Sequence, residues 1–185
     1  MARKESITIQ DILETAFRMT REEGFANVTA RRVAARVGCS TQPIFRVYKN
    51  MEELCQAVYD RAVIFFQEYI EGKESKSKIP FVDLGMSYIS FAMEEKHLFQ
   101  LLFITKGSVQ KEMYEVVNGE RGNVVREITK AAGQGCTNAS DMFMQMWIFI
   151  HGAACMGMTG DYDLKEKETI HLLEEAYRSF AKGGV

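Results

Sequence analysis

The chain has 185 residues, of which 46% are hydrophobic and 26% charged, and its formal net charge is −2. A chain of this length and composition is typical of a globular protein with one or two domains, not of a disordered or fibrous one. No apolar run reaches the length of a membrane span and the first residues lack the apolar region of a signal peptide, so we expect a cytoplasmic protein without membrane contact.

Two helices are predicted in the first 38 residues. Apolar residues recur at helical spacing before Gly24, which marks the end of the first helix, and Thr8 or Ser6 is expected as its N-cap. Thr29 is expected to cap a second, short helix, which Gly38 ends.

A third helix is predicted to begin almost at once. Ser40 is the expected N-cap and Pro43 lies in the first turn, where its missing N–H costs little. Because the residue before a proline resists helical dihedrals, Gln42 is the alternative N-cap. Asn50 followed by Glu53 three residues later predicts a capping-box-like start for a fourth helix.

The rest of the chain is also helical in pattern, and no alternating strand pattern competes with it. The polar segment 72–79 is interpreted as a loop, after which Pro80 opens the next helix. We therefore expect an all-α fold. The further helices are predicted over residues 81–95, 96–104, 109–117, 123–132, 140–158 and 164–181.

The distribution of charge points to a polyanion as partner. Residues 24–51 contain five basic side chains and no acid, in a chain with 25 Asp and Glu. Such a segment predicts a positive surface suited to nucleic acid. A basic face that is merely solvated is the alternative interpretation.

The second and third helices follow each other in the manner of a helix-turn-helix, whose second helix presents its N-terminal residues to base edges in the major groove. Gln42 can make two hydrogen bonds to adenine, and Thr41 can contact base edges or a thymine methyl. Arg46, Tyr48 and Lys49 are expected to reach phosphates and so to fix the register on the duplex.

The first third of the chain resembles the tetracycline-repressor (TetR) family. The resemblance rests on residue types and spacings at Phe17, Gly24, Phe25, Thr29, Arg31, Val33, Ala34, Gly38, Ser40, Ile44, Phe45, Tyr48, Asn50, Glu53 and Leu54. In that family a three-helix DNA-binding domain is joined by a fourth helix to a larger helical domain that binds a small-molecule effector and dimerises. The resemblance therefore implies a DNA-binding domain with its connecting helix over residues 5–65 and an effector-binding and dimerisation domain over residues 66–185.

The resemblance also implies roles for individual residues. Thr29 would cap the second helix and Arg31 would meet a phosphate, while Ser40, Thr41 and Gln42 would face the operator. Two positions depart from the family pattern. Phe45 stands where a tyrosine usually donates to a phosphate, and Met51 stands where a phosphate-binding lysine is common, so neither is expected to make that polar contact.

The helix predicted near the C-terminus is apolar on nearly every side between residues 142 and 158, so a single neighbouring helix cannot cover it. Together with the last helix, it is expected to form a four-helix interface in a homodimer. In this interpretation Gly152, Ala153, Ala154 and Gly157 permit close approach. The alternative is that the two helices close the core of a monomer.

An effector pocket is expected among large adaptable apolar side chains of the C-terminal part. The candidates for its wall are Met86, Phe91, Phe103, Met113, Phe143 and Trp147. The alternative is that these side chains only fill the core.

The function expected from the sequence is a repressor that a small-molecule effector releases from a duplex operator, and the expected homodimer predicts a palindromic operator. A helical carrier of a hydrophobic ligand without DNA binding is the alternative. The sequence carries none of the common catalytic motifs, so no enzyme is expected. Its cysteines and histidines lack the spacing of metal ligands, and we expect neither a metal nor a cofactor.

Overall fold

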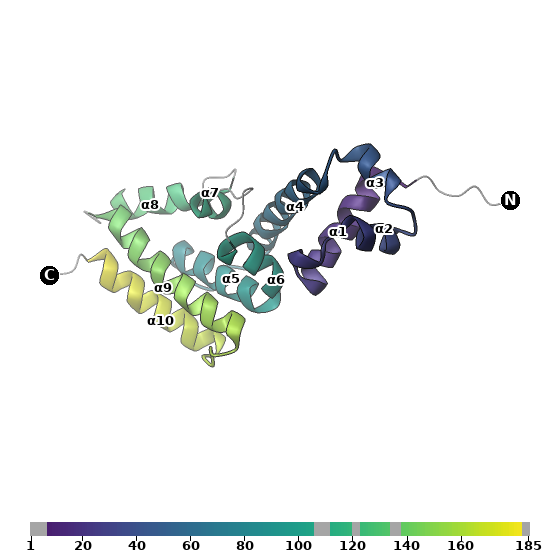
Figure 1. The fold of residues 1–185 in the computed structure, drawn as a ribbon. Helices are drawn as coiled ribbons and strands as arrows, with labels where there is room; N and C mark the ends of the chain where they lie inside the picture. Colours follow the sequence, from purple (N-terminus) through teal and green to yellow (C-terminus); the bar gives the residue numbers. More distant parts are fainter. Residues whose placement is uncertain (1–6, 106–111, 120–122, 134–137, 183–185) are drawn as a thin grey trace. The chain divides into compact units, whose positions relative to one another are not determined.

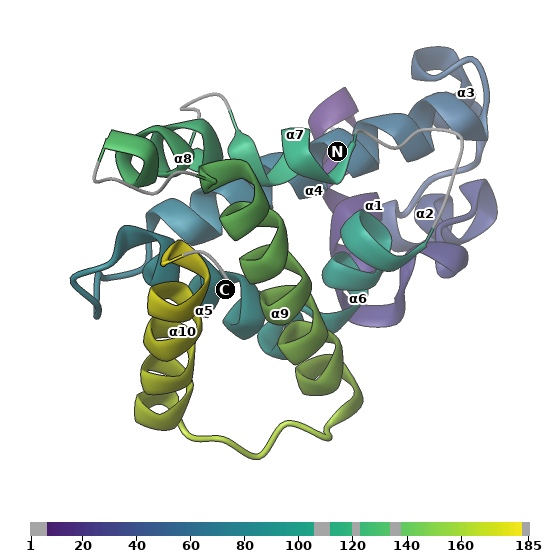
Figure 2. The same ribbon diagram turned by 90° about the vertical axis from the view of Figure 1, so that its left-hand side faces the viewer.

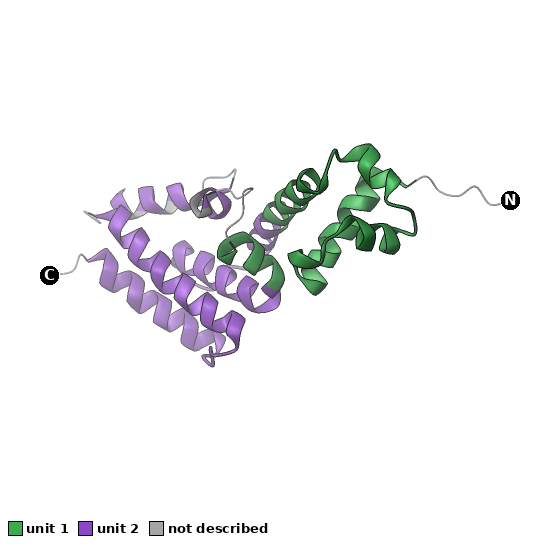
Figure 3. Cartoon of the chain, in the orientation of Figure 1, with its two compact units in different colours: residues 1–65, 97–110 green, residues 66–96, 111–185 purple. Residues whose placement is uncertain are grey.

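The computed structural model describes residues 7–105, 112–119, 123–133 and 138–182, and every regular element in these ranges is helical (Figure 1). The chain divides within one long helix into two compact units (Figure 3). Unit 1 holds residues 1–65 and 97–110, and unit 2 holds residues 66–96 and 111–185. The described residues 97–105 group with unit 1, and the sequence-based division at residues 65 and 66 stays a prediction. No described helix is both long and apolar enough to cross a membrane.

Unit 1 is built on the N-terminal helices. They are α1 (Ile9–Glu23), the 3₁₀ turn η1 (Phe25–Asn27), α2 (Ala30–Val37), α3 (Gln42–Val47) and the first part of α4 (Met51–Glu71). Later in the chain, α6 (Lys96–Phe99) continues into the π-helical turn η2 (Gln100–Ile104), where the sequence predicted one regular helix over residues 96–104.

The ends of α1 and α2 are set by local hydrogen bonds, as predicted. The Thr8 hydroxyl accepts from the Asp11 N–H at 3.1 Å and the Asp11 carboxylate accepts from the Thr8 N–H at 2.8 Å, which completes a capping box. Thr29 caps α2 with its side chain. Gly24 and Gly38 end the two helices, and Gly38 adopts the left-handed conformation, at φ +80°, that glycine reaches without strain.

The start of α3 differs from both sequence-based alternatives. Its N-cap is Thr41, whose side chain makes no capping hydrogen bond, whereas Ser40 and Gln42 were predicted. Gln42 is the first helical residue, and Pro43 follows it in the first turn. A proline is tolerated there because the N–H groups of the first turn have no acceptor within the helix, so its missing N–H removes no hydrogen bond. The predicted start of α4 is confirmed, since the Glu53 N–H donates to Asn50 Oδ1 at 2.9 Å.

The helices of unit 1 enclose one apolar core. It receives side chains from each of the four N-terminal helices, so the short helices α2 and α3 are held by tertiary packing rather than by their own length. The buried members are Ile12, Ala16, Met19, Val28, Val33, Ala34, Ile44, Tyr48, Leu54 and Val58.

Unit 2 is a helical bundle. After α4 it contains α5 (Pro80–Glu94), α7 (Met113–Asn118), α8 (Asn123–Gly133), α9 (Ala139–Thr159) and α10 (Glu166–Ala181). Helix α5 packs along α9, α10 contacts both, and α8 contacts α7 and α9 (Figures 1 and 2). Of the helix predicted over residues 109–117, residues 109–111 lie outside the described residues.

Two glycines allow α5 and α9 to approach closely. A Cβ at Gly85 of α5 would lie 2.8 Å from the Ile150 side chain of α9, and a Cβ at Gly157 of α9 would lie 2.8 Å from the Met93 side chain of α5. Both distances are too short for carbon atoms, so a larger residue at either position would force the facing side chain to move.

Candidate nucleic-acid interface

Helix α3 has one face in the core and one in water. Ile44 is fully buried, whereas Gln42, Phe45 and Arg46 are exposed. Residues three and four apart share a helix face, so these three side chains form one surface. Lys49, just after the helix, is exposed as well. We call Gln42, Phe45, Arg46 and Lys49 the α3 face.

The other predicted operator contacts also lie on the surface of unit 1. Ser40 and Thr41 are exposed at the start of α3, and Thr29 and Arg31 are exposed at the start of α2. Within the described part of the chain, no carboxylate forms an ion pair with Arg31, Arg46 or Lys49. Those three cations are therefore available to phosphates.

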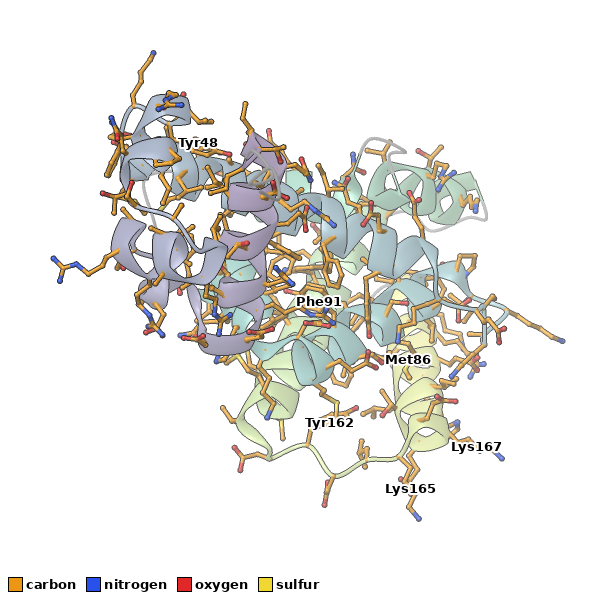
Figure 4. The ribbon with its side chains drawn as sticks, turned by 90° about the vertical axis from the view of Figure 1, so that its right-hand side faces the viewer. Tyr48, Met86, Phe91, Tyr162, Lys165 and Lys167 are labelled. Atoms are coloured by element: carbon orange, nitrogen blue, oxygen red, sulfur yellow. The ribbon has the colours of Figure 1, made fainter. Side chains whose placement is uncertain are left out.

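Tyr48 occupies a different position from the other predicted contacts. Only 7% of its surface is exposed, and its ring is part of the unit 1 core (Figure 4). Burial, together with the Glu53 carboxylate, raises the pKa of the Tyr48 hydroxyl and keeps it neutral. A phosphate contact by this hydroxyl stays a prediction, and the ring itself stabilises the fold.

Two of the five cations in the acid-free segment are paired with acids just before it. Arg32 and Arg36 of α2 both contact the Glu23 carboxylate, and Arg36 Nη1 also donates to Glu22 Oε2 at 2.7 Å. The count of charge along residues 24–51 does not contain these pairs, because the acids come from the last turn of α1. The signal was present, since Glu22 and Glu23 directly precede Gly24.

Only some of the side chains predicted to line the effector pocket lie close to one another in the structure. Phe143 and Trp147 of α9 stack with ring centroids 6.1 Å apart, and Tyr88 of α5 meets the Trp147 ring edge-on at 4.8 Å. Met86 and Phe91 lie on α5 in the same unit (Figure 4).

The structure places neither of the two remaining candidates relative to this group. Phe103 belongs to unit 1 and packs on Phe99 with a centroid distance of 5.2 Å. The side chain of Met113 lies outside what the structure describes. The pocket assignment of all six residues therefore stays a prediction.

Two pockets among the described residues lie away from the side chains predicted to line the effector pocket. One, of about 210 Å³, lies in unit 2 and has both charged and apolar residues in its lining. Its lining residues are Ile70, Glu71, Lys73, Glu74, Ser75, Pro80, Asp83, Leu84, Ser87 and Arg126. The other, of about 390 Å³, lies in unit 1 between η1 and the residues 97–105. None of the six predicted wall residues lines either pocket.

A hydrogen-bonded group of polar side chains lies beside the aromatic stack. His151 Nδ1 lies 2.9 Å from the Tyr88 hydroxyl, and its Nε2 lies 3.6 Å from Cys155 Sγ. Burial lowers the pKa of His151 and raises the pKa of the Cys155 thiol, so both groups are neutral at pH 7. Within the described ranges, no three His, Cys, Asp or Glu residues are grouped so that they could hold a metal ion.

Helix α9 carries an exposed apolar stripe at a spacing of four residues. Met144 is 54% exposed, Ile148 66% and Met156 49%, with Gly152 open between them. By contrast, Ala153 (9% exposed), Ala154 and Gly157 are buried inside unit 2. These three residues therefore permit close packing within the chain, and a contact between two copies at Gly152 stays a prediction.

Comparison with protein families gives two matches. A model described as "Bacterial regulatory proteins, tetR family" matches residues 12–58, and a model described as "Tetracyclin repressor-like, C-terminal domain" matches residues 81–180. A comparison with curated proteins found no match.

Solved structures share the fold. A protein of unknown function from Rhodococcus sp. RHA1 superposes with a TM-score of 0.70 at 19% identity, covering 99% of this chain and 98% of that one. A protein described as a TetR-family transcriptional regulator from Vibrio parahaemolyticus gives 0.67 at 14% identity, covering 92% and 96%. MexZ, a repressor responsible for antibiotic resistance in Pseudomonas aeruginosa, gives 0.62 at 19% identity, covering 92% and 93%. At these identities the likeness shows the fold alone.

Proposed function

Because the chain belongs to the TetR family of bacterial regulatory proteins, we propose that it is a transcriptional repressor that a small-molecule effector releases from its operator. The family consists of DNA-binding transcriptional regulators and not of enzymes, and the alternative of a carrier without DNA binding is set aside on that ground.

The observation that carries the proposal is the α3 face. A short helix is held against the core by Ile44 and presents a polar and cationic surface free of acids. Such a helix fits the major groove, where Gln42 and Thr41 would read bases. Arg31, Arg46 and Lys49 would bind phosphates on either side and orient the helix.

A homodimer is part of the proposal. The α9 stripe exposes large apolar side chains to water in the single chain, and a second copy related by a twofold axis would cover it. Two copies present two α3 helices, so the operator would consist of two inverted half-sites.

The effector is proposed to bind the helical unit 2 among its large apolar side chains. Such a ligand releases the operator only if it binds more tightly to the conformation that does not bind DNA. The designation of MexZ as a repressor supports the repressor role by analogy of fold.

The experiment measures DNA release and the fluorescence of Trp147, the single tryptophan, in the same titration. The operator is a consensus duplex selected by the protein from a randomised pool, and a library of apolar small molecules is screened for release. We expect a releasing compound to change Trp147 emission over the same concentration range, and Phe143→Ala to shift both midpoints. Release without any change in emission or midpoint would place the effector elsewhere, and selection of no consensus would refute sequence-specific binding.

A further inference from the structure

Phe45 is the feature of the α3 face that the proposed function leaves unexplained. All twelve phenylalanines lie in the described ranges, and among them Phe45 alone is exposed, at 47%. It takes no part in the unit 1 core, although the adjacent Ile44 is fully buried there. A large apolar ring that faces water on a six-residue helix contributes little to folding.

The neighbours of Phe45 indicate what covers it. Gln42 precedes it by one turn, Arg46 follows directly, and Lys49 lies just after the end of the helix. Since no carboxylate of the described residues pairs with the side chains of Arg46 and Lys49, this surface is electrostatically suited to DNA and unsuited to a basic partner. The ring therefore lies in the part of the protein that would enter the major groove.

The chemistry of the ring limits what it can contact in that groove. Phenylalanine has no hydroxyl, so it cannot donate to a phosphate or to a base edge. The apolar feature of the major groove is the C5-methyl group of thymine. Resting on the proposed operator binding, we propose that Phe45 is a specificity-determining residue that reads a thymine methyl in each half-site, beside the base that Gln42 reads.

This proposal is tested by removing the methyl group alone. Each thymine of a consensus duplex selected by the wild-type protein is replaced in turn by uracil, which keeps every hydrogen-bonding group. We expect one uracil position in each half-site to weaken binding about fourfold, the value of one buried methyl group. In Phe45→Ala this penalty should disappear, while Phe45→Tyr, which keeps the ring, should retain it.

A matched control is available in the same unit. Ile9 is 57% exposed on α1, and Ile9→Ala removes a comparable exposed apolar side chain away from the α3 face. Ile9→Ala should show the same loss of affinity at each uracil position as the wild type. Circular dichroism should show Phe45→Ala folded, since the residue takes no part in the core.

The outcomes distinguish this proposal from the proposed function beneath it. Equal uracil penalties in the wild type and in Phe45→Ala would overturn it, as would a consensus in which no uracil substitution matters. If Phe45→Ala weakened all duplexes equally without changing the uracil profile, the ring would contact the DNA backbone, and the proposal would be wrong. If the wild type selected no consensus, sequence-specific operator binding itself would fail.

Discussion

Arg36 of α2 donates from Nη1 to Oε2 of Glu22 on α1 at a distance of 2.7 Å, and thereby ties a cation of the helix-turn-helix to an acid outside it. Glu23 makes the same kind of contact with both Arg36 and Arg32. The two acids therefore reduce the positive charge that α2 offers to DNA. Their side chains are partly exposed, so the pairs add little to stability.

Removal of one of these acids is expected to strengthen DNA binding. In Glu23→Gln, Arg32 loses its charged partner and becomes available to phosphates, while Arg36 keeps its contact with Glu22. Affinity for all duplexes should therefore rise and its dependence on salt should steepen. The free energy of unfolding should fall by no more than about 1 kcal/mol. Salt titrations of DNA binding and urea unfolding measure the two effects. Glu166→Gln, which removes the partner of Lys76 in unit 2, is the control and should leave binding unchanged.

Gln42 and Lys49 should have effects of different kinds. Gln42→Ala is expected to cost about 1–3 kcal/mol and to relax base preference at one operator position. Lys49→Ala should weaken binding to every duplex alike and reduce the slope of log affinity against log salt by about one. Lys167, exposed on α10 (Figure 4), supplies the matched control Lys167→Ala. An affinity that does not depend on salt would contradict this assignment of roles.

A charge on the exposed side of α9 should disrupt the dimer, whereas a charge on its buried side should destabilise the fold of the single chain. Ile148 is 66% exposed, so Ile148→Glu should leave the chain folded and produce a monomer. Ala153 is 9% exposed, so Ala153→Glu should bury an unpaired carboxylate and destabilise the chain itself. Sedimentation and circular dichroism measure the two outcomes. A monomeric wild type at micromolar concentration would contradict the proposed dimer.

His151 is expected to make stability depend on pH. Burial lowers its pKa in the folded chain, so the unfolded chain takes up a proton first as the pH falls below the ordinary value of 6.5. Stability contributed by the neutral imidazole is thus present above pH 6.5 and is lost as the pH falls towards the folded-state pKa. Urea midpoints between pH 7.5 and 5.5 should fall more in the wild type than in His151→Asn. A parallel decline in both proteins would contradict the prediction.

The local structure of unit 1 could be predicted because its causes are local. Thr8, Thr29 and Asn50 each satisfy N–H groups within the next three residues, and Gly24 and Gly38 end helices through their own backbone dihedrals. Caps and helical periodicity are properties of short stretches of chain. The exposed positions of Gln42 and Arg46 follow from the same periodicity, once Ile44 is assigned to the core.

The sequence by itself therefore determined the all-α fold, the helix-turn-helix and the residues that α3 turns to solvent. Only the tertiary structure decided which cations remain available, because Arg32 and Arg36 meet acids from another helix. It also decided which side of α9 is buried. That helix is apolar all round, so its periodicity does not distinguish Ala153, packed inside unit 2, from Ile148 on its surface. The difference arises from the close approach of α5 at Gly85 and Gly157, which no pattern along a single helix contains.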